Sequence, residues 1–379
     1  MRKVLVGKLT MKFTIQRDEL YNHLQRLQSV VEKKNTIEVL GNILFNAREG
    51  ALSLSATDLE VGMKVTIPVD LQSDGKMTLS TKHLFEIIKK LPSAPLTFSK
   101  KENDRIEISL GKSKFTLLSL PAEEYPTLPI FEEKAYLTSR AQSLKEMIDL
   151  TSFAASTDAT RYHLNGVFFE PQDNHLIRMT ATDGHRLSFV DQEVFLKEVP
   201  HLKRGVIIPR KGLTEFRKLL EEANEDVGLA FDRNYVFAKI NEYYFFVRLI
   251  EGEYPDYKQA LPQKLDKTAV IPTHSFIDAV ERVSLLAHEK SKAIKLQIQN
   301  GKLLITSNNP DLGSAEEEIE VTYNGENVEI GFNAKFLLDC LPSIKSETFE
   351  FTFKDRLSAS KIQSVDKKNH TYIIMPMRI

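Results

Sequence analysis

The stretch "LSLSATDLE" (residues 52–60) decides the fold, because related stretches return twice further along the chain. They are "IRMTATDGH" (177–185) and "LLITSNNPD" (303–311). Each alternates apolar and polar residues, which is the period of a β-strand, and then runs into an Asp or Asn turn. The turn residues recur at intervals of 125 and 126 residues, at Asp58, Asp183 and Asn309. This spacing indicates a long internal repeat.

Two further patterns repeat with nearly the same period. A lysine lies just inside a helical apolar pattern in "STKHLFEIIKKLP" (80–92), "PRKGLTEFRKLLE" (209–221) and "NAKFLLDCLP" (333–342), at Lys82, Lys211 and Lys335. A tyrosine recurs 129 residues apart in "EEYPTLP" (123–129) and "GEYPDYKQALP" (252–262), at Tyr125 and Tyr254. Another amphipathic helix is predicted before each Asp or Asn turn, over 17–32, 143–156 and 274–290.

The repeats predict an α+β protein built from three copies of one domain. Each copy contains two helices and about eight short strands, and the strands alternate as half-buried antiparallel strands do. We predict domain boundaries at 11–133, 134–262 and 263–379. Residues 1–10 are interpreted as an N-terminal extension, with Met11 as a possible start.

Composition excludes several classes of protein. Lysine plus arginine (51) and aspartate plus glutamate (52) nearly cancel, so no global field draws the chain to nucleic acid or to a membrane. The single cysteine, Cys340, excludes an intramolecular disulfide and fits a reducing compartment. No apolar run approaches the ~18 residues that span a bilayer. We therefore expect a soluble cytoplasmic protein with no membrane partner.

The motifs that suggest an enzyme have simpler interpretations. "TDGHR" (182–186) offers a hydrolase built on Asp183, His185 and Arg186, but Asp-Gly after a strand is a common turn signal. "GKS" (111–113) lacks the earlier glycine of a phosphate loop, and "HEKSK" (288–292) has lysine where a zinc helix needs its second histidine. We expect no catalytic residue, metal or cofactor. A repeat scaffold that binds only proteins remains an alternative.

An ordered set of motifs resembles the bacterial DNA polymerase III beta subunit, the sliding clamp. The set covers nearly the whole chain from Met11 and consists of "LGNILF" (40–45), "SATDLE" (55–60), "RYHLNGVFFE" (161–170), "ATDGHRLS" (181–188), "IIPRKG" (207–212), "EGEYPDY" (251–257), "NNP" (308–310), "VTYNG" (321–325) and "MPMRI" (375–379). Each motif is weak by itself, whereas their common order is highly specific.

The resemblance implies a non-catalytic processivity factor for DNA replication. Two subunits would pair head to tail as a homodimer and close a ring of six domains around double-stranded DNA, which the ring would hold topologically and without sequence preference. The implied partners are a clamp loader and the replicative and repair DNA polymerases, which would bind through short peptide motifs. No cofactor is implied.

Charge is segregated in a way that suits such a ring. Lysine and arginine gather on the predicted helices, while residues 313–331 hold six glutamates and neither lysine nor arginine. A basic lumen would face phosphates without reading bases. The alternative is that these cations only solvate helix faces. The resemblance implies that the DNA-facing residues include Lys34, Lys82, Arg161, Tyr162, Arg210 and Lys211.

The C-terminal "YIIMPMRI" (372–379) is unusually apolar for a chain end. The resemblance implies that it forms part of a partner-peptide pocket with Leu164, Thr182, Gly184, His185, Arg186, Leu187, Pro255, Gln259, Ala260, Tyr323, Ile373, Met375, Pro376, Met377 and Arg378. Methionine gives an adaptable apolar surface, and we expect Arg186 and Arg378 to hold polar peptide groups at the rim. Gln259 and Ala260 depart from the basic and larger aliphatic residues common in relatives. The alternative is that Ile373–Met377 is only the last core strand.

Overall fold

A computed structural model describes residues 11–31, 36–129, 137–172, 176–193, 202, 204–223 and 226–378. The chain groups into two compact units. Unit 1 contains Met1–Ala141 and Thr214–Arg248, and unit 2 contains Gln142–Leu213 and Leu249–Ile379.

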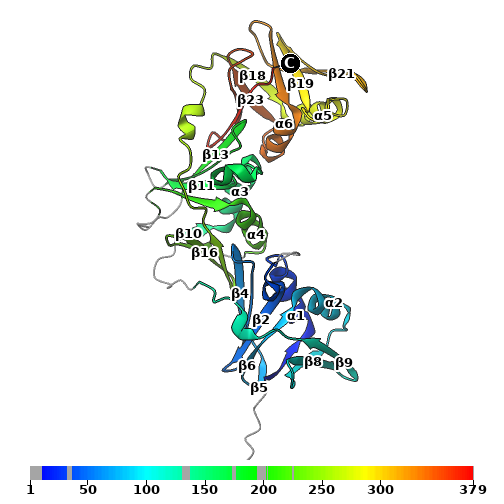
Figure 1. Cartoon of the computed structure of the whole chain (residues 1–379). Coiled ribbons are helices and arrows are strands. Elements are labelled where there is room, and N and C mark those ends of the chain that lie inside the picture. The colour runs from blue at the N-terminus through cyan, green and yellow to red at the C-terminus, as the bar shows by residue number, and fades with distance from the viewer. Residues whose placement is uncertain are drawn as a thin grey trace, which may run out of the picture. The chain divides into compact units, whose positions relative to one another are not determined.

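The first repeat begins with a strand and a helix and places its second helix after five more strands (Figure 1). Its elements are β1 (Lys12–Gln16), α1 (Arg17–Leu27), β2 (Asn42–Arg48), β3 (Ala51–Thr57), β4 (Val61–Pro68), β5 (Asp70–Ser73), β6 (Gly75–Ser80), α2 (Thr81–Lys90), β7 (Pro95–Lys100), β8 (Arg105–Leu110) and β9 (Ser113–Leu118), with short 3-10 helices η1 (Glu38–Gly41) and η2 (Ala122–Glu124).

The second and third repeats follow the same order with one strand fewer. The second repeat contains β10 (Leu137–Arg140), α3 (Ala141–Thr151), η4 (Ser152–Ala154), η5 (Ala159–Leu164), β11 (Gly166–Pro171), β12 (Leu176–Thr182), β13 (Arg186–Glu193), β14 (Val206–Pro209), α4 (Arg210–Leu220), β15 (Asp226–Phe231), β16 (Tyr235–Ile240), β17 (Tyr243–Arg248) and η7 (Tyr257–Ala260). The third contains β18 (Lys267–Pro272), α5 (Thr273–Ser284), β19 (Ala293–Gln299), β20 (Lys302–Asn309), β21 (Gly313–Glu320), β22 (Val328–Asn333), α6 (Ala334–Cys340), η8 (Leu341–Ser343), β23 (Thr348–Phe353), β24 (Ser360–Ser364) and β25 (His370–Ile374).

This order confirms the predicted α+β class with two helices and about eight strands in each repeat. The three repeated lysines occupy the same place, the second residue of α2, α4 and α6. Helices α1 and α2 lie side by side in unit 1, as α5 and α6 do in unit 2 (Figure 1). The strands bury alternate residues, as in β19, where Ile294, Leu296 and Ile298 are buried and their neighbours are not.

The sheets do not follow the repeat boundaries. Unit 1 contains a five-stranded sheet in the order β5-β1-β7-β8-β9 and an eight-stranded sheet in the order β10-β15-β16-β17-β4-β3-β2-β6. Unit 2 contains an eight-stranded sheet in the order β14-β11-β12-β13-β25-β24-β23-β18 and a four-stranded sheet in the order β21-β20-β19-β22. Second-repeat strands therefore pair directly with first-repeat strands at β17–β4 and with third-repeat strands at β13–β25.

The first helix of each repeat is shorter than the sequence pattern predicts. Helix α1 ends at Leu27, α3 at Thr151 and α5 at Ser284. Beyond these ends the backbone forms 3-10-type hydrogen bonds, in which the amide of residue i+3 donates to the carbonyl of residue i. One runs from the Val30 amide to the Leu27 carbonyl. Such bonds satisfy carbonyls that the last α-helical turn leaves without a partner. The apolar pattern continues through these turns, so periodicity alone extends the helix.

The Asp turns confirm the repeat at the level of hydrogen bonds. Thr57 Oγ1 donates to the Val61 carbonyl, and Asp58 Oδ1 accepts the amides of Glu60 and Val61. The matching turn after β12 has the same three bonds, as described below. No helix in the described part of the chain is long and apolar enough to cross a membrane.

Candidate functional site

The turn between β12 and β13 is closed by its own side chains. Thr182 Oγ1 donates to the Arg186 carbonyl at 2.5 Å, and Asp183 Oδ1 accepts the amides of His185 and Arg186 at 2.9 and 3.1 Å. Gly184 has a φ of +89°, which favours glycine. The Asp183 carboxylate is thus a turn-forming group, which agrees with the turn interpretation of "TDGHR" and not with an acid–base pair.

Arg186 joins this turn to helix α6. Its guanidinium donates to Asp183 Oδ2 at 3.0 Å, to Asp339 Oδ2 at 2.6 Å and to the Phe153 carbonyl at 2.7 Å. The guanidinium carbon also lies 4.6 Å from the ring centroid of Phe336. With 7% of its surface exposed, Arg186 is buried, and the predicted position at a solvent-exposed rim is wrong for this residue. Arg378 is exposed.

The C-terminal segment has two parts. Strand β25 is buried and central in its sheet, pairing with both β13 and β24. Beyond it, the Met375 amide donates to the His185 carbonyl at 2.9 Å, and the Met377 amide donates to the Gly331 carbonyl at 2.8 Å. Met375, Pro376 and Met377 are half-buried. The core-strand interpretation therefore holds for Ile373 and Ile374 and stops at Met375.

A row of pocket residues follows the strand register. Thr182 lies opposite Leu187 across β12–β13, and Leu187 lies opposite Ile373 across β13–β25. Leu187 and Ile373 pack with Tyr257 in one apolar cluster. This cluster connects the row to η7, whose exposed residues Gln259 and Ala260 were also predicted for the pocket. Pro255, just before η7, is exposed as well.

Two predicted pocket residues have other environments. Tyr323 is buried in the third-repeat core, where its ring lies 5.7 Å from that of Phe353 and its hydroxyl donates to the Glu326 carbonyl at 2.8 Å. We therefore leave Tyr323 out of the pocket. Leu164, the last residue of η5, is buried at 7% exposure.

Phe336 is the residue that the sequence reasoning missed. Its ring lies 6.4 Å from the His185 imidazole at an interplanar angle of 18°, beside the Arg186 guanidinium. A signal was present in the repeated lysine motif. The residue after the lysine is His83, Gly212 or Phe336, so only the third copy places a large aromatic ring there.

The predicted DNA-facing residues lie in several settings. Lys82 and Arg210 are exposed in the first turns of α2 and α4, and Tyr162 is 57% exposed. Lys211 follows Arg210 and is half-buried. Lys34 lies outside the described residues. Arg161 is exposed, and its Nη1 donates to the Asp183 carbonyl at 2.9 Å in the β12–β13 turn.

Many helix cations are neutralised by neighbouring acidic groups. Arg26 pairs with Glu222, Lys218 with Glu215 at 2.8 Å, and Arg282 with Glu317 at 2.6 Å. Arg17 pairs with Asp18 at 2.8 Å and also donates to the Ile88 and Lys89 carbonyls at the end of α2, where a cation interacts favourably with the helix dipole. Lys82, Lys89 and Lys90 of α2 form no ion pair with any other described residue. Helix α2 therefore carries three lysines that take part in no ion pair among the described residues.

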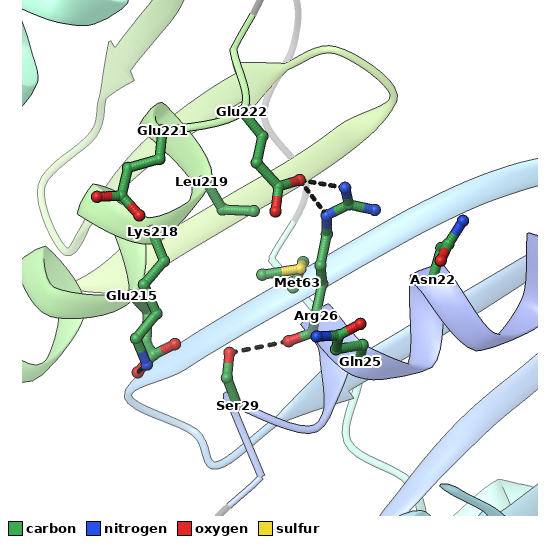
Figure 2. Close-up of a pocket in the computed structure, with 10 residues that line it drawn as sticks. All are labelled: Asn22, Gln25, Arg26, Ser29, Met63, Glu215, Lys218, Leu219, Glu221 and Glu222. Carbon is green, nitrogen blue, oxygen red and sulfur yellow. Dashed lines mark hydrogen bonds and ion pairs between the residues drawn. The ribbon is translucent and has the colours of Figure 1, made fainter. Parts of the chain in front are cut away.

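A polar cavity of about 300 Å³ lies between α1 and α4 in unit 1 (Figure 2). Arg26 and Glu222 meet across it, Met63 lies behind Arg26, and Glu215 and Lys218 face each other at its other end. Arg26 also donates from Nη1 to the Tyr243 hydroxyl at 2.9 Å. The same hydroxyl lies 2.6 Å from His23 Nδ1, and a neutral imidazole with an unprotonated Nδ1 can accept its proton there. Burial lowers the pKa of His23, which favours this neutral form.

We expect Tyr243→Phe to lower the free energy of unfolding by about 1–3 kcal/mol, because it leaves buried His23 Nδ1 without a partner and removes one bond from half-buried Arg26. The residue is 3% exposed, and burial raises its pKa to about 12. Glu222→Gln should cost less than about 1 kcal/mol, since the Glu222 side chain is 50% exposed and its ion pair is screened. Urea unfolding of both variants measures the difference. Equal losses would contradict the central role of the hydroxyl.

Within the described ranges, no group of three or more His, Cys, Asp or Glu side chains could hold a metal ion. The site consists of turn, strand and tail residues from two repeats, with the apolar cluster of Leu187, Tyr257 and Ile373 at its centre. Such a surface is suited to binding an extended segment of another protein rather than to catalysis.

Comparisons with known proteins identify the family of the chain. Residues 11–129, 139–256 and 258–378 match the N-terminal, central and C-terminal domains of the DNA polymerase III beta subunit. A beta sliding clamp from Pseudomonas aeruginosa is 37% identical over 371 residues, covering 97% of this chain and 100% of the relative. One from Escherichia coli is 32% identical over 370 residues, with 97% and 100% covered.

Solved structures give the same result. The DNA polymerase III beta subunit from P. aeruginosa superposes with a TM-score of 0.92 at 36% identity, over 97% of this chain and 100% of that one. The Caulobacter crescentus beta sliding clamp, solved with polyethylene glycol bound to its proposed beta-motif tethering region, has a TM-score of 0.92 at 35% identity, over 98% and 100%. The chain belongs to the DNA polymerase III beta subunit family, the beta sliding clamps. It is a non-catalytic factor that gives processivity to DNA polymerase III.

Proposed function

We propose that two copies of this chain pair head to tail and close a ring around double-stranded DNA. Three domains per copy, bounded at 11–133, 134–262 and 263–379, would supply six domains to the ring. The ring would retain DNA topologically, so that no base is read and no tight contact is needed. A clamp loader would open it, in the cytoplasm. Residues 1–10, interpreted as an extension, lie outside the described residues.

Two edge strands with opposite charge carry the proposal of a head-to-tail pair. Strand β9 is the last strand of the five-stranded sheet in unit 1, and β21 is the last strand of the four-stranded sheet in unit 2. Lys114, Thr116 and Leu118 are exposed along one face of β9. Glutamates are exposed along one face of β21, at Glu316, Glu318 and Glu320.

Edge strands of this length offer unpaired backbone groups and are usually covered. Pairing β9 of one copy with β21 of a second would continue both sheets and bring Lys114 near the glutamates. The opposite faces carry half-buried apolar residues, Phe115 and Leu117 on β9 and Ile319 on β21, which would extend the cores. Among the residues that the structure describes, Leu285 after α5 and Leu118 are the two most exposed large apolar residues, at 76% and 72%, which also favours a covered surface.

DNA would be faced by the helices, with α2 as the main contributor of positive charge. On α2, the positive charges come from Lys82, Lys89 and Lys90. At the start of α4, they come from Arg210 and Lys211. Tyr162 is exposed and can approach the backbone. Arg161 is assigned to the peptide pocket instead, because its guanidinium is held against the β12–β13 turn.

Polymerases and other DNA-processing proteins would bind through short peptides at the pocket of unit 2. Its revised residues are Leu164, Thr182, Gly184, His185, Arg186, Leu187, Pro255, Gln259, Ala260, Phe336, Ile373, Met375, Pro376, Met377 and Arg378, with Arg161 at the edge. Arg186 is buried and would support the pocket indirectly, because it holds the β12–β13 turn against α6. Exposed Gln259 and Ala260 would leave this wall uncharged and small, so a peptide with a bulky apolar side chain fits there better than an acidic one.

The ring is tested by retention on circular and linear duplex DNA after loading. We expect stable retention on the circle and release once the circle is cut, because the protein slides off the ends. Leu118→Asp and Leu285→Asp should each weaken the dimer at least about tenfold in sedimentation and abolish retention, since a carboxylate is buried at the contact. Leu357→Asp is the matched control, an exposed leucine at 64% exposure outside both edges. Equal release from circles and linear DNA would overturn the ring.

A further inference from the structure

Three charged residues form a row across the sheet of unit 2. Glu170 on β11 is the register partner of Arg178 on β12, and Arg178 is the partner of Asp191 on β13. Asp191 accepts two bonds from Arg178, from Nε at 2.7 Å and from Nη2 at 2.6 Å. The Arg178 guanidinium carbon lies 4.4 Å from the ring centroid of Phe189. The two parallel bonds to Asp191 therefore fix the orientation of the Arg178 guanidinium.

Tyr257 bonds to the first two members of this row, Glu170 and Arg178. Its hydroxyl donates to Glu170 Oε1 at 2.5 Å and accepts from Arg178 Nη1 at 3.3 Å. The phenol thus bridges an acid and a base that share a face of the sheet. Tyr257 is 5% exposed, whereas the next three residues, 258–260, are all exposed.

The segment around Tyr257 has few other attachments. Tyr254 stacks on Phe168 with ring centroids 4.9 Å apart and an interplanar angle of 2°. Asp256 closes the first turn of η7 by accepting the Lys258 amide at 3.2 Å and the Gln259 side-chain amide at 3.1 Å. These last bonds lie within the segment, so they shape it without fixing it to the sheet. Tyr254 and Leu261 pack against the apolar cluster at the two ends of the segment, and Tyr257 between them adds its hydroxyl bonds to the sheet.

We propose that Tyr257 is a positioning residue for the peptide pocket. By locking its hydroxyl between Glu170 and Arg178, the chain holds η7 on the sheet and so places Gln259 and Ala260 against the row Thr182–Leu187–Ile373. Tyr257 itself packs with Leu187 and Ile373 and does not need to contact the peptide. The inference rests on the proposed peptide pocket, because η7 supplies one wall of it. Because this wall is already ordered in the free protein, peptide binding loses less conformational entropy, which strengthens affinity.

Tyr257→Phe tests this directly, because it removes one hydroxyl and keeps the ring in the apolar cluster. In the full-length dimer without peptide, we expect amides of 257–261 to exchange with solvent about tenfold faster, as expected for one lost charge-assisted hydrogen bond. The Kd for a polymerase-derived peptide should rise about tenfold, and DNA retention should not change. Glu170→Gln, which keeps an acceptor without its charge, should give a smaller change in the same two readouts. Tyr235→Phe, in unit 1, is the matched control and should change neither.

The outcomes separate this inference from the pocket itself. Unchanged exchange of 257–261 in Tyr257→Phe and Glu170→Gln would overturn the anchoring. Faster exchange with unchanged peptide affinity would show that η7 is not a wall of the pocket and would also overturn the inference. If the unaltered chain binds no such peptide, the proposed pocket fails, and this role of Tyr257 fails with it. If Tyr257→Phe does not fold, Glu170→Gln carries the test alone through the same exchange and affinity measurements.

Discussion

Deleting residues 375–379 is expected to abolish peptide binding while the chain stays folded and dimeric. Strand β25 ends at Ile374 and keeps both neighbours, β13 and β24, after the deletion. What is lost is the half-buried Met375–Met377 surface and two backbone bonds, to His185 and Gly331. Central apolar residues of an interface typically account for more than ~2 kcal/mol, so the peptide Kd should rise at least about 30-fold.

Peptide affinity, the urea midpoint and DNA retention have to be measured on the same preparation. Met375→Ala with Met377→Ala is a milder second variant that preserves both backbone bonds. We expect it to weaken the peptide without any change in the midpoint. Undiminished affinity in both variants would refute the pocket. A large fall in the midpoint after deletion would mean that the tail belongs to the core, which is the interpretation that the structure limits to Ile373 and Ile374.

Acidification from pH 7 to pH 4 should remove about 3 kcal/mol of stability through His370 alone. The residue is 4% exposed, and its Nε2 lies 2.9 Å from Ser188 Oγ. Because Ser188 donates its only proton to the Leu150 carbonyl at 2.5 Å, Nε2 must carry a proton and donate to Ser188. Burial lowers the pKa of His370 to about 4.

The pH window follows from these pKa values. In the unfolded chain His370 binds a proton near pH 6.5, whereas in the folded chain it resists protonation down to about pH 4. The unfolded state therefore binds more protons between these values, and stability falls as the pH falls through the window. NMR should show a His370 ring that does not titrate above pH 5.5. His370→Gln should flatten the pH dependence of the urea midpoint, and exposed His274→Gln should leave it unchanged. A ring that titrates near pH 6.5 would contradict the assignment.

The sequence predicted features that depend on neighbours along the chain. The repeated Asp turns and the lysines at the second position of α2, α4 and α6 were correct, because a turn closed by Asp58 or Asp183 uses bonds within four residues. Two features could not be predicted in this way: the neutralisation of Arg26 by an ion pair and the burial of Arg186. Their partners, Glu222 and Asp339, lie 196 and 153 residues further on.

The pocket shows the same division. Ile373 and Leu187 were identified together and meet as register partners. Tyr323 was included by order along the chain, whereas the side chain that stacks on His185 is Phe336, brought there by helix α6. Which of two aromatic residues 13 positions apart reaches a turn more than 130 residues earlier depends on strand pairing, and no local period encodes it.

Strand β17 pairs with β4, and β13 pairs with β25. The segment that repeats in sequence is therefore not the segment that forms one compact folded unit. Cutting the chain between repeats would tear a continuous sheet and leave Val61–Pro68 or Arg186–Glu193 with a bare, apolar edge. Fragments meant for expression, or chimaeras between relatives, should therefore exchange β10 and β15–β17 together with the first repeat, and β11–β14 together with the third. A recombination that respects only the sequence period would join well-matched motifs and still break two backbone ladders.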